Sequence, residues 1–242
     1  MIENKFVSVI IAAAGMSNRM GSKINKAFLR INDKPILAHT IEKFERSKYI
    51  DEIIIVCKED EIDYTRKEIV NRYKFNKVVN IVKGGKERQD SVYNGIKAIS
   101  VNADIVLTHD GARPFIRTET INKAVETVLN CDACVVGVRV KDTIKSVNED
   151  DTVHHTPKRS LLWQAQSPQC FKKDVLLRGY EHAIKENILA TDDSALVEFA
   201  GVEVKMLEGH YDNIKITTPE DLVIAEIFNT NWKKKLKSTG AF

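Results

Sequence analysis

The chain has 242 residues and a net charge of +3, with 43% hydrophobic and 29% charged residues. This balance is ordinary for a globular protein with a sizeable core, and the small net charge predicts neither a nucleic-acid partner nor a membrane-surface partner. No apolar stretch approaches the ~20 residues of a membrane span. The apolar run near the N-terminus predicts a first buried strand rather than a signal peptide.

The cysteines do not predict a metal site. Of the four, Cys57, Cys131, Cys134 and Cys170, only Cys131 and Cys134 form a C-x-x-C pair. A zinc site would need a second pair, or histidines at ligand spacing, and neither accompanies this one. Plain buried thiols are the favoured interpretation, and they fit a cytoplasmic protein in a reducing compartment.

Short β-branched segments alternate with helical patterns along the chain. Strands are expected at Val7–Ala12, Glu52–Cys57, Val78–Val82, Ile105–Thr108, Cys134–Val140, Leu162–Gln166 and Val202–Met206. Helices are expected at Pro35–Arg46, Glu61–Tyr73, Asp90–Ile99, Thr118–Asn130, Asp174–Glu186, Asp192–Phe199 and Pro219–Leu236. Continuous apolar strands separated by helices predict an α/β fold with a mostly parallel, doubly wound sheet, here as one domain over residues 1–242. Such sheets bind ligands at the carboxyl ends of their strands.

One segment breaks this alternation. Residues 142–159, DTIKSVNEDDTVHHTPKR, are polar, and the flanking Val138–Val140 and Leu161–Trp163 suit the two sides of a hairpin. A long polar excursion inside a compact fold is usually functional or an interaction element. We therefore expect an arm that protrudes from the sheet rather than a second domain.

The first expected strand leads into the small residues Ala13, Ala14 and Gly15, and the basic Arg19 and Lys26 follow. Small residues let the backbone approach a phosphate or a base, their amides can bind an anion, and the two cations suit a polyphosphate. The segment matches neither G-x-x-x-x-G-K-[ST] nor G-x-G-x-x-G, which disfavours a Walker-type kinase and a nicotinamide-dependent oxidoreductase. A small-residue turn with solvated cations is the alternative interpretation.

A second glycine-containing loop, Gly84-Gly85-Lys86-Glu87-Arg88-Gln89-Asp90-Ser91, follows the third strand and opens a helix. Its paired glycines would permit close contact with a planar base. Asp90 or Ser91 would equally serve as a helix N-cap, and for the loop taken alone this is the favoured interpretation.

The fourth strand runs into His109-Asp110-Gly111-Ala112-Arg113-Pro114. An aspartate at the carboxyl end of a strand is well placed for a metal ion or a ribose hydroxyl. His109 has the chemistry of an acid–base group, but a single histidine at a strand end is more often structural.

Seven motifs occur in an order that is more specific than any one of them: AAGMSNRM, GGKERQDSV, HDGARP, VKDTIK, PKRSLLWQAQSPQCF, TDDSALVE and EGHYDNIKITTPEDL. Together they resemble the 2-C-methyl-D-erythritol 4-phosphate cytidylyltransferase family of the non-mevalonate isoprenoid pathway. The resemblance implies a Rossmann-like nucleotidyltransferase fold, CTP and 2-C-methyl-D-erythritol 4-phosphate as substrates, Mg²⁺ dependence, and a homodimer joined by the 142–159 arm. Ribitol-5-phosphate cytidylyltransferase, which shares these motifs, is the alternative function.

The resemblance also implies roles for individual residues. Arg19, Lys26 and Lys215 would be catalytic, the first two at the triphosphate and Lys215 at phosphate in the reaction centre. Nucleotide binding would fall to Ala13, Ala14, Gly15, Gly85, Ser91, Asp110 and Ala112, with Asp110 also near the metal. The methylerythritol phosphate would be bound by Arg113, Thr143, Arg159 and Thr191, some of them serving the partner subunit's site. Two departures from the family pattern are Lys86, where an acidic residue can occur, and Ser167, which replaces a threonine but keeps a hydroxyl.

Overall fold

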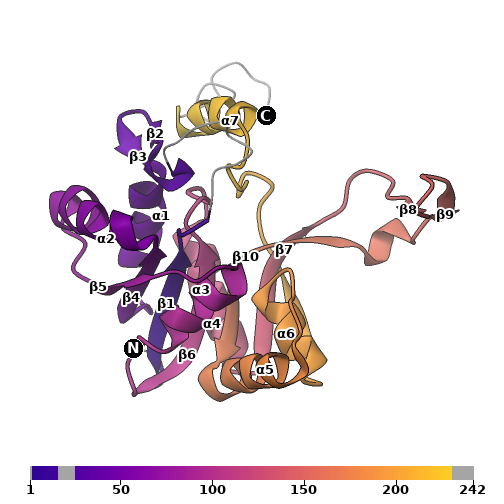
Figure 1. Ribbon diagram of the computed structural model, residues 1–242, viewed down its shortest axis with the longest axis horizontal. Coiled ribbons are helices and arrows are strands. Elements are labelled where there is room, and N and C mark those ends of the chain that lie inside the picture. The colour runs from indigo at the N-terminus through magenta and orange to yellow at the C-terminus, as the bar shows by residue number, and fades with distance from the viewer. Residues whose placement is uncertain (1, 16–24, 231–242) are drawn as a thin grey trace.

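The structure, a computed structural model, describes residues 2–15 and 25–230. Its centre is a seven-stranded sheet with the order β11-β7-β10-β6-β1-β4-β5 (Figure 1). Only β10 runs antiparallel to its neighbours in this sheet; every other pair is parallel, as the sequence predicted. The strands are β1 (Phe6–Ala12), β4 (Glu52–Cys57), β5 (Val78–Lys83), β6 (Ala103–Asp110), β7 (Ala133–Arg139), β10 (Trp163–Lys172) and β11 (Val204–Glu208).

Helices cover both faces of the sheet. On one side lie α1 (Ile36–Glu45) and α4 (Thr118–Val128), and on the other α3 (Arg88–Ile96), α5 (Lys173–Glu186) and α6 (Asp193–Phe199). Because side chains alternate along a strand, Val9 and Ile11 of β1 enter the first core and Ile10 enters the second. A mostly parallel sheet between two helical layers is the expected Rossmann-like fold.

Some element boundaries differ from the predictions. The strand expected at Leu162–Gln166 continues to Lys172, because the polar and proline-containing stretch after Ala165 resumes pairing with β6 and β7. The helix expected at Glu61–Tyr73 is three shorter pieces, η3 (Glu59–Glu61), α2 (Ile62–Tyr64) and η4 (Thr65–Asn71). The helix α7 is described from Pro219 to Asn229, and the rest of its predicted range lies outside the described residues.

A small hairpin was not predicted. Its strands β2 (Arg30–Ile31) and β3 (Lys34–Pro35) are joined by Asn32 and Asp33, whose φ angles of 46° and 62° are typical of a tight hairpin turn. The strands have two residues each, which is too short for an alternation of polar and apolar residues to be recognised. With α7, the hairpin encloses a third apolar cluster, which contains Ile31 and Ala225.

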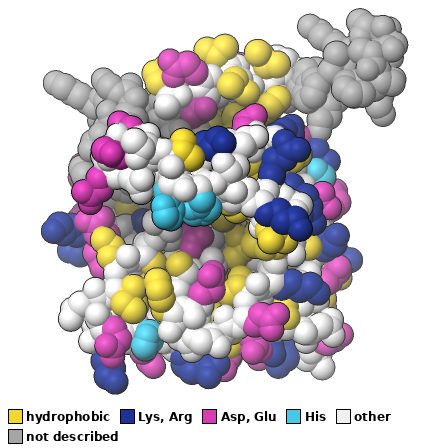
Figure 2. Space-filling view, turned by 90° about the vertical axis from the view of Figure 1, so that its right-hand side faces the viewer, with side chains coloured by type: hydrophobic (Ala, Val, Ile, Leu, Met, Phe, Trp, Pro, Cys, Tyr) yellow, Lys and Arg dark blue, Asp and Glu magenta, His cyan; other side chains and the backbone are white. Residues whose placement is uncertain are grey.

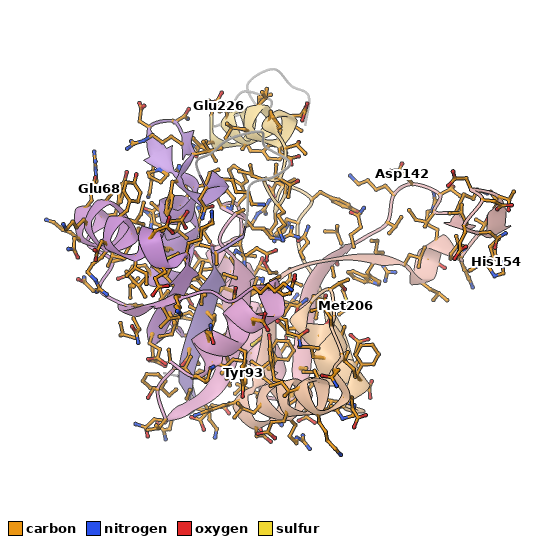
Figure 3. All side chains as sticks on the ribbon, viewed as in Figure 1. Glu68, Tyr93, Asp142, His154, Met206 and Glu226 are labelled. Carbon is orange, nitrogen blue, oxygen red and sulfur yellow. The ribbon has the colours of Figure 1, made fainter. Side chains whose placement is uncertain are left out.

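The predicted arm is present and projects away from the sheet (Figure 1). It leaves β7, forms a small sheet of β8 (Ser146–Val147) and β9 (Val153–His155), and returns through η5 (Arg159–Leu161) to β10. Figure 3 shows His154 at its far end. Val153 and Leu161 on the arm are 56% and 74% exposed, so this segment has no core of its own.

The cysteines agree with the thiol interpretation. All four are unpaired; Cys57, Cys134 and Cys170 are buried, whereas Cys131 is partly exposed. Burial raises the pKa of the Cys57 thiol to about 11. Within residues 2–15 and 25–230, no helix has the length and apolar character needed to cross a membrane.

Candidate active site

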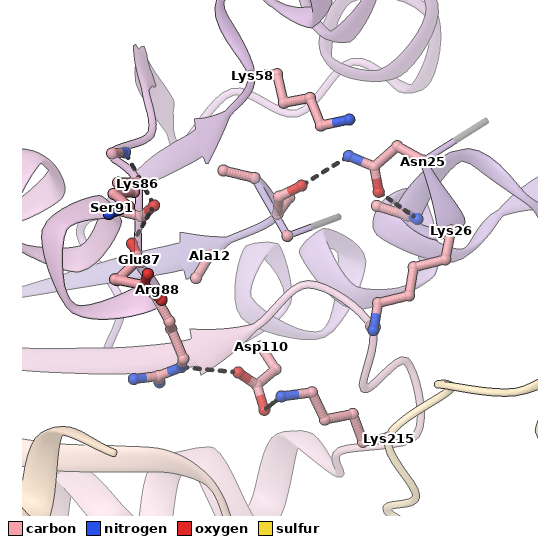
Figure 4. Close-up of a pocket in the computed structure, with 16 residues that line it drawn as sticks. Ala12, Asn25, Lys26, Lys58, Lys86, Glu87, Arg88, Ser91, Asp110 and Lys215 are labelled. Atoms are coloured by element: carbon pink, nitrogen blue, oxygen red, sulfur yellow. Dashed lines mark hydrogen bonds and ion pairs between the residues drawn. The ribbon is translucent and has the colours of Figure 1, made fainter. Parts of the chain in front are cut away.

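The carboxyl ends of β1, β4, β5 and β6 surround a cavity of about 700 Å³ (Figure 4). Its wall combines small residues from the strand ends with several cations and two carboxylates. The lining residues are Ala12, Ala13, Ala14, Gly15, Asn25, Lys26, Ala27, Lys58, Gly85, Lys86, Glu87, Arg88, Ser91, Asp110, Ala112 and Lys215. The structure thus gathers nine of the predicted site residues from five segments that are distant in sequence.

The end of β1 forms the floor of the cavity. The N–H of Ala13 donates to the carbonyl of Val56 at 2.7 Å, which extends the strand pairing one residue beyond Ala12. Asn25 and Lys26 also line the cavity, and Lys26 begins the short helical turn η2 (Lys26–Phe28). Arg19, predicted to be catalytic, lies outside the described residues.

The second glycine loop packs directly against the first. A Cβ atom on Gly84 would lie 2.4 Å from the Cβ of Ala14, and one on Gly85 would lie 2.2 Å from the Cβ of Asp90. Both glycines are therefore required by contacts within the protein, in addition to any contact with a base. The hydroxyl of Ser91 accepts the N–H of Gly85 at 3.0 Å and so fixes the loop.

The predicted cap of α3 was wrong in its position. Glu87, not Asp90 or Ser91, is the N-cap residue, and the Asp90 carboxylate accepts the Glu87 N–H at 3.0 Å in a capping box. The helix therefore begins at Arg88, two residues earlier than the sequence predicted, and this places Arg88 in the cavity wall.

Asp110, at the end of β6, is the electrostatic centre of the site. Its carboxylate lies 3.0 Å from Lys215 Nζ, 3.3 Å from Arg88 Nε and 3.3 Å from Arg113 Nε. Burial by itself would raise the pKa of this carboxyl, but Lys215, Arg88 and Arg113 outweigh burial and hold it well below its usual range. Asp110 is thus ionised at neutral pH and forms ion pairs with three cations beside the cavity.

Lys215 reaches this position because its segment is bound to the end of β6. The N–H of Ile216 donates to the carbonyl of Ala112 at 2.9 Å, and Arg113 Nη1 donates to the carbonyl of Asn213 at 2.9 Å. The buried side chain of Asn213 donates in turn to the carbonyl of Ser167 at 3.0 Å. The hydroxyl of Ser167 accepts the Asp110 N–H at 3.1 Å.

Arg88 is a site residue to which the sequence assigned no role. Its guanidinium donates two bonds to Asp193, at 3.0 and 2.9 Å, and the Tyr180 hydroxyl donates to the same carboxylate at 2.6 Å. Arg88 therefore links the start of α3 to α5, α6 and Asp110. No local pattern in the sequence indicates this partner, because Asp193 lies 105 positions from Arg88.

The four residues assigned to the polyol phosphate are dispersed in a single chain. Arg113 lies behind Asp110, and Thr191 is exposed in the loop before α6; neither appears among the described residues that line the cavity. Thr143 and Arg159 are on the arm, which projects away from the sheet (Figure 1), and neither is among the described residues that line the cavity. Their proposed roles therefore depend on what the arm contacts.

The structural interpretation of His109 is favoured. The ring is fully buried and packs edge-on against Phe44 with centroids 4.8 Å apart, and Nε2 is 3.2 Å from the carbonyl of Arg113. Burial lowers the pKa of His109 to about 3, so the imidazole is neutral at physiological pH. Being inaccessible, this side chain is unsuited to proton transfer with a substrate.

A divalent cation would find one well-placed carboxylate here. No group of three or more acidic, histidine or cysteine side chains suited to a metal occurs among the described residues. Mg²⁺ in nucleotide sites, however, takes only one or two carboxylates and completes its shell with phosphate oxygens and water. Asp110 could supply that carboxylate. Lys215 and Arg113 contact Oδ2, whereas Arg88 contacts Oδ1, which keeps a second lone pair for another ligand.

Comparison with known proteins gives one consistent result. Residues 7–231 match the model of a family described as 2-C-methyl-D-erythritol 4-phosphate cytidylyltransferase. The chain is 50% identical over 232 residues to the protein of that name from Clostridioides difficile (strain 630), covering 96% of this chain and 97% of that protein. It is 52% identical over 217 residues to the protein of that name from Clostridium acetobutylicum, covering 90% and 94%.

Solved structures agree with this result. The crystal structure of 4-diphosphocytidyl-2C-methyl-D-erythritol synthase from Anaerococcus prevotii superposes with a TM-score of 0.84 and 34% identity, covering 94% of this chain and 97% of that one. The 2-C-methyl-D-erythritol 4-phosphate cytidylyltransferase from Thermus thermophilus superposes with a TM-score of 0.75 and 28% identity, covering 92% and 98%.

Proposed function

Since this chain belongs to the 2-C-methyl-D-erythritol 4-phosphate cytidylyltransferase family, we propose that it transfers CMP from CTP to 2-C-methyl-D-erythritol 4-phosphate and releases pyrophosphate. This is a nucleotidyltransferase reaction of non-mevalonate isoprenoid precursor biosynthesis. The observation that carries the proposal is the convergence of Lys26, Lys215 and Asp110 on one cavity beside the small-residue end of β1. The names of the relatives favour this substrate over ribitol 5-phosphate.

The proposed chemistry needs positioning and charge rather than a general base. An oxygen of the phosphate monoester, already an anion at neutral pH, forms a bond to the α-phosphorus of CTP, while the bond from that phosphorus to the bridging oxygen breaks and pyrophosphate departs. Figure 4 shows the side chains of Lys26 and Lys215 extending toward the region beside Asp110. Two ammonium groups there would neutralise negative charge as it develops on the α-phosphate.

Mg²⁺ is part of the proposal, with Asp110 as the protein ligand and the CTP phosphates supplying further oxygens. When bound, the ion would neutralise charge on the triphosphate and on the departing pyrophosphate. Lys215, Arg88 and Arg113 keep Asp110 ionised, which a hard cation requires. We also place the enzyme in the cytoplasm, in keeping with its four unpaired cysteines.

Pyrophosphate release tests the function directly. We expect turnover with CTP and 2-C-methyl-D-erythritol 4-phosphate, and much less when ATP, GTP or UTP replaces CTP or when ribitol 5-phosphate replaces the polyol phosphate. Equal turnover with a purine triphosphate would contradict the assignment of the Gly84–Ser91 loop to cytosine. Preference for ribitol 5-phosphate would instead select the alternative enzyme.

The arm supports a homodimer in which each subunit completes the other's site. Its apolar side chains Ile144, Val147 and Val153 are exposed. Its charged residues are the basic Lys145, Lys158 and Arg159 and the acidic Asp142, Glu149, Asp150 and Asp151. Figure 2 faces that side of the molecule and shows histidine and basic side chains gathered there. The basic side chains Lys158 and Arg159 at the base of the arm suit an anionic substrate in a neighbouring subunit, and a two-fold dimer would exchange two such arms.

Mixed dimers test this exchange. The Arg159→Ala and Lys215→Ala homodimers are each expected to be nearly inactive. A purified heterodimer of the two chains should regain activity, because one of its two sites combines an intact body with an intact arm. Heterodimers as inactive as their parents would show that Arg159 serves its own chain, and a fully active monomer in light scattering would exclude the dimer altogether.

A further inference from the structure

Asn25 is a buried polar residue of the cavity to which the proposed reaction assigns no role. Its side chain is among the most enclosed in the site, with only 4% of the residue exposed. Nδ2 donates to the carbonyl of Ala13 at 2.8 Å and to Glu61 Oε2 at 2.8 Å, and Oδ1 accepts the N–H of Ala27 at 3.0 Å. Figure 4 shows the amide between the end of β1 and the turn that carries Lys26.

These three partners require an amide. The N–H of Ala27 needs an acceptor, whereas the Ala13 carbonyl and the Glu61 carboxylate each need a donor. Only the side-chain amide of asparagine or glutamine combines one acceptor oxygen with two donor hydrogens on one nitrogen. The partners also fix which end of the amide carries nitrogen. Aspartate has the same shape and caps a helical turn equally well, but it would place a carboxylate against two oxygens.

The bonds of Asn25 join three elements at one side of the cavity. Ala13 is held in the sheet by Val56, and Glu61, at the end of η3, also accepts the N–H of Lys58 at 3.3 Å. Asn25 connects both to η2, whose first residue is Lys26. The Asn25 side chain, immediately before Lys26 in the sequence, therefore ties the start of η2 directly to the end of β1.

We infer that Asn25 is a positioning residue for Lys26, holding it in register with the small-residue end of β1 so that its ammonium group meets the triphosphate of CTP. The inference rests on the proposed role of Lys26. A catalytic group displaced by about 1 Å can lose on the order of 10²-fold in rate, so loss of the two donated bonds should be visible in kinetics.

The Asn25→Asp variant separates positioning from capping. It keeps an acceptor for the Ala27 N–H and loses both donors. We expect kcat/KM for CTP to fall by about 10- to 100-fold, through both kcat and KM, with KM for the polyol phosphate little changed. If Asn25 only stabilises the fold, Asn25→Asp should lower the Tm but leave kcat/KM for CTP at the wild-type value, and that result would overturn the inference.

A second substitution should restore part of the loss. In Asn25→Asp with Glu61→Gln, the glutamine amide can donate to the new carboxylate and so rebuild the bond to η3 with donor and acceptor exchanged. We expect kcat/KM for CTP to recover several-fold over Asn25→Asp alone. No recovery would contradict a role for the Asn25–Glu61 bond. If Asn25→Asp does not fold, Asn25→Ser replaces it: the serine hydroxyl can still accept the Ala27 N–H but is too short to bond to both Ala13 and Glu61.

Two further variants separate this inference from the proposed function. Asn122→Ala removes an asparagine that accepts the Ser47 hydroxyl at 2.6 Å between α1 and α4, away from the cavity, and should leave the kinetics unchanged. Lys26→Ala should lose activity at least as severely as Asn25→Asp. If Lys26→Ala is impaired but Asn25→Asp is not, the inference alone is wrong; a fully active Lys26→Ala would remove the role of Lys26 itself.

Discussion

Replacing Lys215 with alanine is expected to lower turnover by on the order of 10²-fold or more, comparable to removing a preorganised donor from an oxyanion site. The Lys215 ammonium lies 3.0 Å from Asp110, yet its side chain remains 34% exposed. The free energy of unfolding should change little, because Asp110 retains Arg88 and Arg113 as partners after the substitution. Steady-state kinetics and thermal melts of the same preparation measure both effects.

The pattern of kinetic changes distinguishes Lys215 from Lys26. Lys26 follows the nucleotide loop, so Lys26→Ala should weaken CTP binding together with turnover. Lys215 comes from the segment after β11, so its loss should also raise KM for the polyol phosphate. The exposed Lys67 provides a matched control, and Lys67→Ala should change stability by less than about 0.5 kcal/mol and leave kinetics intact. Near-wild-type turnover in Lys215→Ala would show that the catalytic lysine is assigned wrongly.

The strands of the sheet and the helices between them could be predicted because each is indicated by a short run of neighbouring residues. The β-branched stretch Glu52–Cys57 is buried at every position, and its predicted limits match β4. The strand β10 was predicted only in its first half, because Gln166-Ser167-Pro168-Gln169 has the composition of a turn. Its pairing with Val106 and Leu107 depends on two neighbouring strands that compensate for the unfavourable local sequence.

The residues that line the cavity could be predicted where a motif contains them, and not where a partner distant in sequence defines their position. Asp110 ends β6 and Lys26 begins η2, and both lie in motifs by which resemblance to a family selected them. Asn25 and Arg88 have ordinary local explanations, a turn residue and a helix start. Their partners Glu61 and Asp193 lie 36 and 105 positions away, and no periodicity or spacing in one sequence relates such residues.

Arg88→Met is expected to cause the largest loss of stability. Asp193 is almost wholly buried, with its side chain 1% exposed, and its charge is balanced by the two hydrogen bonds from Arg88. Removing one partner of a buried ion pair leaves an uncompensated charge and costs about 3–5 kcal/mol. In a protein of this size that corresponds to a decrease in Tm of about 6–20 °C.

Two comparisons make the cause of this loss identifiable. Arg72 forms an exposed pair with Glu68 at 3.0 Å on η4, so Arg72→Met should lower the free energy of unfolding by less than about 0.5 kcal/mol. Adding Asp193→Asn to Arg88→Met removes the stranded charge while the amide oxygen still accepts the Tyr180 hydroxyl, so the double variant should be more stable than Arg88→Met alone. Two results would contradict this explanation: the stability losses of Arg88→Met and Asp193→Asn simply add in the double variant, or the Tm of Arg88→Met equals that of the Arg72→Met control. In either case Arg88 does not neutralise Asp193, and another interaction connects the start of α3 to α6.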